Sequence, residues 1–341
     1  MSNQEIIYPS NISIRKLPIN FSPADSGIFE HELKVEIHPT FLLRLKGINI
    51  SSDGILFRGI HVLPETFPIP ALKTNWINST AYIKFLAKNL LSHYRKFENA
   101  VWITDTWSNG YFHWLTDALP RLYVMGEWIE NELLLLPQSF QEINYILPSL
   151  KPFSVRNLEF MKGTVHIKNL KMPMHTAPTG NFNESIIREV RGLITDYYKH
   201  TDCEIIGNKI YVSRSKARKR KISNEEECLA ILAEYGFKII YFEDYTFEQQ
   251  VKIAMNAKYI ISNHGAGLTN ILFMESGSCV LELRKEGDFL DNCYFSMASA
   301  MNLHYFYQLC IAENPEEDAH TANLIIDCNL LRKNIESMLA L

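Results

Sequence analysis

A histidine and an aspartate with helical spacing are the first residues that could perform chemistry. His113 and Asp117 lie four positions apart in the stretch YFHWLTDALPRLY, residues 111–123. On a helix this spacing places both side chains on one face, where a histidine and a carboxylate can act as a general base and its orienting partner. The same spacing also fits an ordinary hydrogen-bonded pair on a helix surface, and two residues are too few to indicate a metal site. The sequence Leu119-Pro120 is expected to kink or end this helix.

A glycine-containing loop is the second candidate. The stretch SNHGAGLTNILF, residues 262–273, separates the apolar segments 257–261 and 279–283. If a helix begins directly after this loop, its first backbone N–H groups have no partner and, together with the helix dipole, favour an anion such as a phosphate. Gly265 and Gly267 would let that anion approach the backbone closely. The alternative is a tight turn with Asn263 as the helix cap; the loop has neither the P-loop nor the GxGxxG signature.

A basic stretch, SRSKARKRK at residues 213–221, is the third candidate. Arginine guanidinium groups match phosphate oxygens two at a time. The stretch follows a strand-like segment, so in a parallel sheet its cations would lie on the same edge as the glycine loop. A solvated basic loop or a nucleic-acid patch is the alternative interpretation. The two anion-favouring loops together favour a diphosphate site.

The second half of the chain alternates strand and helix patterns. Ser223 to Glu226 and Thr246 to Gln249 have the sequence of capping boxes, each opening a helix. This alternation predicts a parallel sheet with helices on its faces. The expected strands are 209–213, 237–241, 257–261 and 279–283, and the expected helices are 223–235, 246–256 and the segment from the glycine loop to Met274.

The first half is less regular. Residues 1–70 contain β-like segments, and the later residues add both strand and helix patterns. The expected strands are 32–37, 41–45, 55–57, 100–104 and the apolar run 133–136, and the expected helices are 79–94, a segment from about 112, and 186–198.

Composition narrows the class of protein. The chain has 341 residues, 47% of them hydrophobic and 21% charged, which is typical of a globular protein with a large core. The formal net charge of −4 argues against attraction of the whole surface to nucleic acid or to an anionic membrane. The six cysteines form no CxxC pair and no metal-ligand spacing. With no apolar run of membrane-spanning length and no signal-peptide pattern, a cytoplasmic location with reduced thiols is expected.

The three stretches, in this order, resemble glycosyltransferase family 61. The segment His113–Leu122 matches the family block His-Trp-Leu-x-(Asp/Glu)-x-Leu-Pro-Arg-Leu. Residues 213–225 match a Ser-Arg run that ends in Arg-x-Ile-x-Asn-Glu, and His264–Met274 matches His-Gly-Ala-Gly-Leu-Thr-Asn-x-x-Phe-Met. The similarity covers roughly residues 100–285 and does not extend to the first seventy.

The resemblance implies an α/β fold of the GT-B type, with two Rossmann-like domains whose mainly parallel sheets face a cleft. Residues 1–200 would be the acceptor-side domain, with 1–70 as a β-rich addition, and residues 201–341 the nucleotide-sugar-binding domain. The implied reaction is an inverting, metal-independent transfer from a nucleotide-diphosphate sugar, expected to be a UDP-sugar. The expected acceptor is a glycan or lipid-linked glycan in capsule, O-antigen or lipopolysaccharide synthesis, handled in the cytoplasm or peripherally at the inner face of the membrane.

The residue chemistry and the resemblance together predict roles for individual residues. Asp117 is the expected general base, with His113 as its partner or replacement. No metal and no other cofactor is expected, because cations and backbone amides would neutralise the departing diphosphate. Asn224 and Glu225 match the family motif but are interpreted as helix-capping residues. The expected nucleotide-sugar-binding residues are Arg214, Arg220, Asn263, His264, Gly265, Ala266, Gly267, Thr269 and Asn270, with Glu282 for the ribose hydroxyls.

Two other classes of protein remain as alternatives. A nicotinamide-dependent epimerase or dehydrogenase would share the Rossmann-like fold, but GxGxxG and an acidic residue about twenty positions beyond a glycine loop are missing. A nucleic-acid-binding module would use the basic run 214–221 and would show steep salt dependence.

Overall fold

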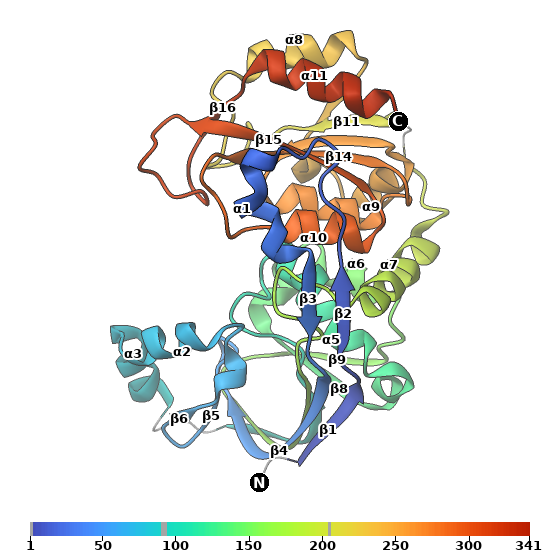
Figure 1. Ribbon diagram of the computed structural model, residues 1–341. Helices are drawn as coiled ribbons and strands as arrows, with labels where there is room; N and C mark the ends of the chain where they lie inside the picture. Colours follow the sequence, from blue (N-terminus) through green and yellow to red (C-terminus); the bar gives the residue numbers. More distant parts are fainter. Residues whose placement is uncertain (1–2, 90–93, 204–205) are drawn as a thin grey trace. The chain divides into compact units, whose positions relative to one another are not determined.

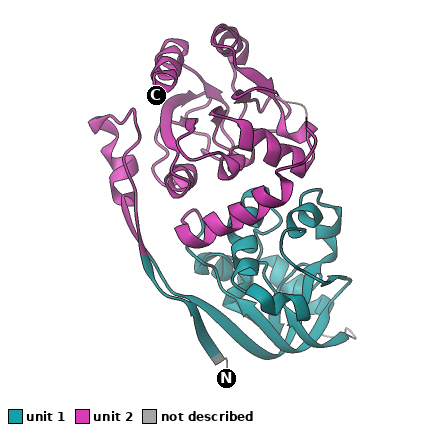
Figure 2. Cartoon of the chain, turned by 90° about the vertical axis from the view of Figure 1, so that its right-hand side faces the viewer, with its two compact units in different colours: residues 1–11, 37–179 teal, residues 12–36, 180–341 magenta. Residues whose placement is uncertain are grey.

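The structure is a computed structural model that describes residues 3–89, 94–203 and 206–341 (Figure 1). Its contacts divide the chain into two compact units (Figure 2). Unit 1 comprises residues 1–11 and 37–179, and unit 2 comprises residues 12–36 and 180–341. The expected first domain ended at residue 200, whereas in the structure the last segment of unit 2 already begins at Gly180. The difference is the helix Glu184–Tyr198, which the contacts assign to unit 2.

Unit 1 is built on a mixed sheet with strand order β6-β5-β4-β10-β7-β8-β9, to which β1 is added beside β4. Strand β4 pairs antiparallel with β1, β5 and β10, whereas β10, β7, β8 and β9 run parallel. Apolar side chains such as Trp102, Leu135 and Ile167 fill the core beneath the sheet. The strands are β1 Asn3–Tyr8, β4 Thr40–Ile50, β5 Leu56–Arg58, β6 His61–Val62, β7 Arg95–Val101, β8 Leu133–Pro137, β9 Asn157–Met161 and β10 Val165–Pro173.

Unit 2 contains the parallel sheet that the alternating pattern predicted. Its strand order is β12-β11-β13-β14-β15-β16, parallel from β12 to β15, with β16 antiparallel at the edge. Helices α8 and α11 cover one face, and α9 and α10 cover the other (Figure 1). The strands are β11 Lys209–Val212, β12 Lys238–Ile240, β13 Tyr259–Asn263, β14 Cys279–Lys285, β15 His304–Ala312 and β16 Leu324–Ile325; the helices are α7 Glu184–Tyr198, α8 Glu225–Glu234, α9 Phe247–Asn256, α10 Cys293–Ala300 and α11 Cys328–Leu339.

The two expected capping boxes have different outcomes. Helix α9 begins after Thr246. The Thr246 side chain accepts a hydrogen bond from the backbone N–H of Gln249, and the Gln249 side chain accepts one from the backbone N–H of Thr246, which confirms this capping box. The box expected at Ser223 is wrong. Helix α8 begins after Asn224, whose amide instead bonds the backbone of Ile326 on a distant segment. Glu225 is also not a cap. Its carboxylate accepts hydrogen bonds from the hydroxyl of Tyr211, in strand β11, and from that of Ser213, directly after the strand.

Several element boundaries differ from the expected ones. The helix expected at 79–94 is α3, Thr80–Asn89, and residues 90–93 lie outside the described residues. The strand expected at 100–104 is β7 and ends at Val101, and the strand expected at 257–261 is β13 and continues to Asn263. Among the described residues, no helix combines the length and apolar character required to cross a membrane.

Candidate functional site

The candidate catalytic helix in unit 1 is continuous through its proline. It consists of α4 Tyr111–His113, a π-helical turn Trp114–Ala118 and α5 Leu119–Tyr123. The N–H of Leu119 donates to the carbonyl of Trp114, five residues earlier, which widens the turn ahead of Pro120. Proline is tolerated in the first turn of α5, so the helix does not end at Leu119-Pro120, which was one of the two expected outcomes.

The expected pairing of His113 with Asp117 is present. His113 Nδ1 lies 2.8 Å from Asp117 Oδ2, and Thr179 Oγ1 donates to the same oxygen at 2.9 Å. The Asp117 side chain is 3% exposed, whereas that of His113 is 26% exposed. The geometry therefore makes the imidazole the accessible member of the pair and the carboxylate its orienting partner.

A second histidine–carboxylate pair, which the sequence did not predict, belongs to the same network. His175 Nε2 lies 2.7 Å from Asp105 Oδ2, and the fully buried Arg121 places Nη1 3.6 Å from that oxygen. Arg121 Nε donates to the carbonyl of Pro173 at 2.7 Å. Arg121 lies inside the family-like block, but nothing in the local sequence around Asp105 or His175 indicates that they meet.

The charges in this network stabilise one another. Burial alone would raise the pKa of Asp105, but the hydrogen bond and charge of His175 and the charge of Arg121 lower it to about 2. Burial lowers the pKa of Arg121 to about 10 despite the opposing attraction of Asp105 and Asp117, so the guanidinium stays charged at neutral pH. The buried cation thus helps His175 to hold Asp105 ionised.

Replacing Asp105 with asparagine is expected to lower the free energy of unfolding in a pH-dependent way. The folded pKa of about 2 lies below the ordinary 3.8, so the stabilisation is complete above 3.8 and is lost as the pH falls toward 2. The difference from wild type should be about 2 kcal/mol at neutral pH and shrink over that range. Urea unfolding at several pH values measures it. Glu98→Gln, which removes an exposed carboxylate paired with Lys168, is the control and should change stability little; a pH-independent difference for Asp105→Asn would contradict the assignment.

The glycine loop and the basic stretch meet in unit 2. Strands β11 and β13 are parallel neighbours, with Val212 opposite Ser262, so the loops that follow them leave the same edge of the sheet. A Cβ on Gly265 would overlap the guanidinium of Arg214, so the guanidinium packs directly on this glycine. Asn263 Nδ2 donates to the carbonyl of Arg220, so Asn263 fixes the basic loop and is not the helix cap of the alternative interpretation.

The helix after the loop is a 3₁₀ helix, Ala266–Phe273, preceded by Gly265. Its first backbone bond runs from the N–H of Leu268 to the carbonyl of Gly265, at 2.8 Å. In a 3₁₀ helix the N–H groups of Ala266 and Gly267 precede that bond and have no partner within the helix. A Cβ on Gly267 would lie 3.3 Å from Val212 Cγ1, so close packing against β11 explains this second glycine.

Both expected phosphate-binding arginines have unused hydrogen-bonding capacity. Within the described residues, the buried Nε atoms of Arg214 and Arg220 have no hydrogen-bond partner. Burial lowers the pKa of Arg214, and the charge of Arg220 lowers it further. Buried polar atoms are normally satisfied, so an anion between these groups would explain both.

Thr269, Asn270, Glu282 and His264 were also expected to contact the nucleotide, but the geometry does not support these four contacts. Thr269, Asn270 and Glu282 are each 0% exposed. Thr269 faces the hydroxyl of Tyr294, and the Asn270 amide donates to Gln250 and to the carbonyl of Gly267. The helix turns these two side chains into the protein interior, a direction that the local sequence does not specify.

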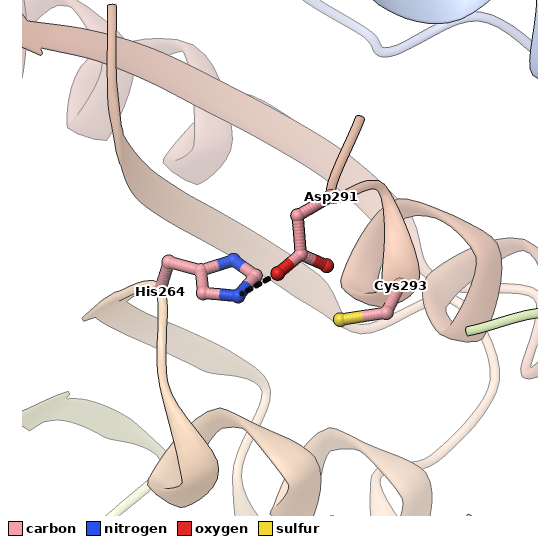
Figure 3. Close-up of side chains that lie close together, drawn as sticks. All are labelled: His264, Asp291 and Cys293. Atoms are coloured by element: carbon pink, nitrogen blue, oxygen red, sulfur yellow. Dashed lines mark ion pairs between the residues drawn. The ribbon is translucent and has the colours of Figure 1, made fainter. Parts of the chain in front are cut away.

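Glu282 and His264 bond each other. His264 Nδ1 lies 2.5 Å from Glu282 Oε1, and Tyr305 donates to the other carboxylate oxygen, so Glu282 is not positioned to bind a ribose. His264 Nε2 lies 3.0 Å from Asp291 Oδ2, which engages its second ring nitrogen as well (Figure 3). Burial would lower the pKa of His264, but the hydrogen bonds to Asp291 and Glu282 raise it to about 9. Both ring nitrogens therefore face carboxylates, whereas the sequence predicted that His264 would bind a phosphate.

One group of residues near the glycine loop could hold a metal ion. His264, Asp291 and Cys293 place their potential ligand atoms within 4.8 Å of one another. The sequence gave no sign of this group, because His264 and Asp291 are distant along the chain and no recognised ligand spacing joins them.

Comparison with known proteins identifies the class. Residues 111–281 match the family described as Glycosyltransferase 61. An EGF domain-specific O-linked N-acetylglucosamine transferase of Drosophila melanogaster is 35% identical over 98 residues, which are 28% of this chain and 18% of the relative. The bovine (Bos taurus) protein of the same description is 33% identical over 91 residues, 25% of this chain and 17% of that relative. A human (Homo sapiens) protein O-linked-mannose beta-1,4-N-acetylglucosaminyltransferase 2 is 37% identical over 81 residues, 23% of this chain and 14% of that relative.

These matches place the chain among the glycosyltransferases. The chain belongs to glycosyltransferase family 61. The family match includes His113 and Asp117, the basic stretch and the glycine loop, and it ends before Asp291 and Cys293. The aligned segments span less than a fifth of the length of these curated relatives.

Proposed function

We propose that this protein transfers a sugar from a nucleotide-diphosphate donor, a UDP-sugar, to a hydroxyl of a glycan acceptor. The transfer inverts the anomeric centre and uses no metal ion or other cofactor in the chemical step. The observation that carries the proposal is the packing of the Arg214 guanidinium on Gly265, which joins the basic stretch to the glycine loop. The proposal retains the GT-B architecture, with unit 1 as the acceptor-side domain and unit 2 as the donor-side domain.

The donor diphosphate is proposed to bind in unit 2, against the N–H groups of Ala266 and Gly267 and the guanidinium groups of Arg214 and Arg220. Each hydrogen bond to a charged group contributes about 1.5–3 kcal/mol, and the helix terminus adds on the order of 0.3–2 kcal/mol. Several such contacts together supply the charge stabilisation that a divalent ion gives in other transferases. His264, Thr269, Asn270 and Glu282 take no direct part in this revised site.

The base is proposed to lie in unit 1. His113 replaces Asp117 as our first choice, because the carboxylate is buried and accepts hydrogen bonds from Thr179 and Thr116 as well as facing His113. With Nδ1 facing Asp117, the Nε2 atom of His113 is the one that would accept the proton of the acceptor hydroxyl. Asp117 then orients the ring and stabilises the imidazolium that forms.

A small cavity in unit 1 suits the acceptor. It has a volume of about 200 Å³ and borders the loop that leads to the His113 helix. Its lining combines hydroxyl, amide and carboxylate groups with one aromatic ring, which is the chemistry that recognises a sugar. The lining residues include Thr104, Asp105, Thr106, Asn109, Ser139 and Phe140.

The relatives guide the choice of donor and acceptor to be tested. The names of the fly and human proteins both specify transfer of N-acetylglucosamine, so UDP-N-acetylglucosamine is the first donor to test. Our proposed acceptor is a glycan or lipid-linked glycan of capsule, O-antigen or lipopolysaccharide, which would place the protein in the cytoplasm or at the inner face of the membrane. A protein-linked acceptor, as named for the relatives, is the second candidate.

A ligand screen by thermal shift tests the proposed class of function. The protein is heated with UDP, GDP, CDP, NAD or a DNA oligonucleotide, each with EDTA present. Because a ligand that binds only the folded state stabilises it by mass action, UDP is expected to raise the midpoint in a saturable way. Stabilisation by NAD alone would favour the dehydrogenase alternative. Binding of the oligonucleotide with steep salt dependence and no response to UDP would favour the nucleic-acid alternative.

Gly265→Ala should weaken UDP binding without unfolding the protein. The added methyl would overlap the Arg214 guanidinium, which is the flexible end of a side chain and can move aside. Losing this charged contact should weaken binding by about 10- to 100-fold, which isothermal titration measures. Gly192→Ala is the matched control and should leave binding unchanged, because a Cβ at this position of helix α7 meets no described atom within 4 Å outside its own helix backbone and chain neighbours. Equal affinity in both variants would remove Gly265 and Arg214 from the donor site.

A further inference from the structure

His264, Asp291 and Cys293 form a cluster that the proposed transfer reaction does not use. Their potential ligand atoms all lie within 4.8 Å of one another, and His264 Nε2 is 3.0 Å from Asp291 Oδ2. Figure 3 shows the imidazole, the carboxylate and the thiol side chains gathered around one point. When ligand atoms bind a common ion at about 2.0–2.3 Å, the distances between the ligand atoms are similar to those found in this cluster. Small side-chain movements would therefore suffice for coordination.

A fully buried carboxylate orients the histidine of this cluster. Glu282 Oε1 lies 2.5 Å from His264 Nδ1 and thereby directs Nε2 toward Asp291. Glu282 is itself held by the hydroxyl of Tyr305. A carboxylate that bonds the second nitrogen of a ligating histidine is typical of metal sites, where it fixes the ring and increases its basicity.

The backbone that carries the cluster is also well fixed. His264 directly follows strand β13, and Cys293 is the first residue of helix α10. The fully buried Arg284 donates to the carbonyls of Asp288 and Asp291 at 2.9 and 3.1 Å. The ligand-bearing segments are thus held in place by secondary structure and by a buried cation, as a preorganised site requires.

The chemistry of the donors selects the kind of ion. We propose that His264, Asp291 and Cys293 bind one zinc-type divalent ion, with Glu282 as the residue that orients His264. An imidazole, a carboxylate and a thiolate suit zinc, whereas magnesium and calcium prefer oxygen ligands alone. Binding displaces the protons carried by the Cys293 thiol and by His264 Nε2, and three protein ligands leave one position for water. None of the three ligands is among the arginines and amides that are proposed to bind the diphosphate.

Zinc titration of the 341-residue chain tests this site. The purified protein, stripped of metal with EDTA and then dialysed, is titrated with Zn²⁺ against a chromophoric chelator. Wild type should bind one equivalent, and Asp291→Asn and Cys293→Ala should bind at least about tenfold more weakly, the scale for damage to a metal site. Cys328→Ala, which removes a thiol outside the cluster, is the matched control and should bind as wild type does. Failure of wild type to bind one equivalent, or equal binding by all four proteins, would overturn the proposal.

Cobalt substitution provides a second readout that does not depend on stability. With Co²⁺ in place of zinc, wild type and Cys328→Ala should show a thiolate-to-metal charge-transfer absorption that Cys293→Ala lacks. Its persistence in Cys293→Ala would exclude Cys293 as a ligand and overturn the site as proposed. Because UDP binding is measured separately with EDTA present, failure of the zinc site and failure of the transferase proposal give different results.

Discussion

Arg214→Ala is expected to lower turnover by roughly 10²–10³-fold, the scale observed when one donor to a developing negative charge is removed. The guanidinium lies on Gly265, beside the amides proposed to bind the diphosphate, and its buried Nε has no partner among the described residues. As the sugar leaves the diphosphate, negative charge builds up on the phosphate oxygens, and a nearby cation stabilises that charge more than it stabilises the bound donor. The effect should therefore appear mainly in kcat.

The measurement is the rate of UDP release from UDP-N-acetylglucosamine, or from the donor that the ligand screen selects, at saturating donor. Arg218→Ala is the matched control, because it removes an identical charge from an exposed position in the same basic stretch. The control should retain turnover within a few-fold. If Arg214→Ala folds and turns over at the wild-type rate, Arg214 does not bind the diphosphate. If both variants lose activity equally, the basic stretch acts through its total charge.

Asp117→Asn is expected to reduce transfer by about 10²–10⁴-fold, the range associated with loss of general acid–base catalysis. Asp117 Oδ2 accepts hydrogen bonds from the His113 ring and from Thr179. An asparagine lacks the negative charge that stabilises the imidazolium formed when Nε2 accepts the proton, and its NH2 group, if turned toward the ring, favours the tautomer without a free Nε2. UDP affinity should not change, because unit 2 alone is proposed to bind the nucleotide.

The experiment compares kcat, donor KM and UDP affinity in Asp117→Asn, His113→Gln and the control Thr179→Val. The first two should show the same large loss in kcat, since the pair acts as a unit. Thr179→Val removes one hydrogen bond to the carboxylate but keeps the His113 contact, so its loss should be much smaller. Loss of UDP binding together with transfer in Asp117→Asn would identify Asp117 as a structural residue. Full activity of His113→Gln would return the role of base to Asp117.

The sequence was sufficient for features that depend on neighbours along the chain. The four-residue spacing of His113 and Asp117 predicts their contact because a helix brings such positions together, and the widened turn before Pro120 did not disturb it. The alternation of strands and helices predicts the parallel sheet of unit 2. Parallel neighbouring strands then bring the loops after β11 and β13 to one edge, which placed the basic stretch beside Gly265. The order and content of the three motifs also indicated the family.

The tertiary structure decided everything that depends on partners distant in sequence. Asn224 has a capping sequence, yet its amide bonds Ile326. Glu282 was expected near the end of a strand, where a ribose contact was plausible, yet β14 continues to Lys285 and Glu282 holds His264. The Asp105–His175 pair and the cluster of His264, Asp291 and Cys293 have no local pattern. Periodicity and capping rules describe interactions over three or four residues. Which side chains satisfy a buried polar group is instead set by strand order and by the packing of helices on the sheet, and these arise only when the whole unit folds.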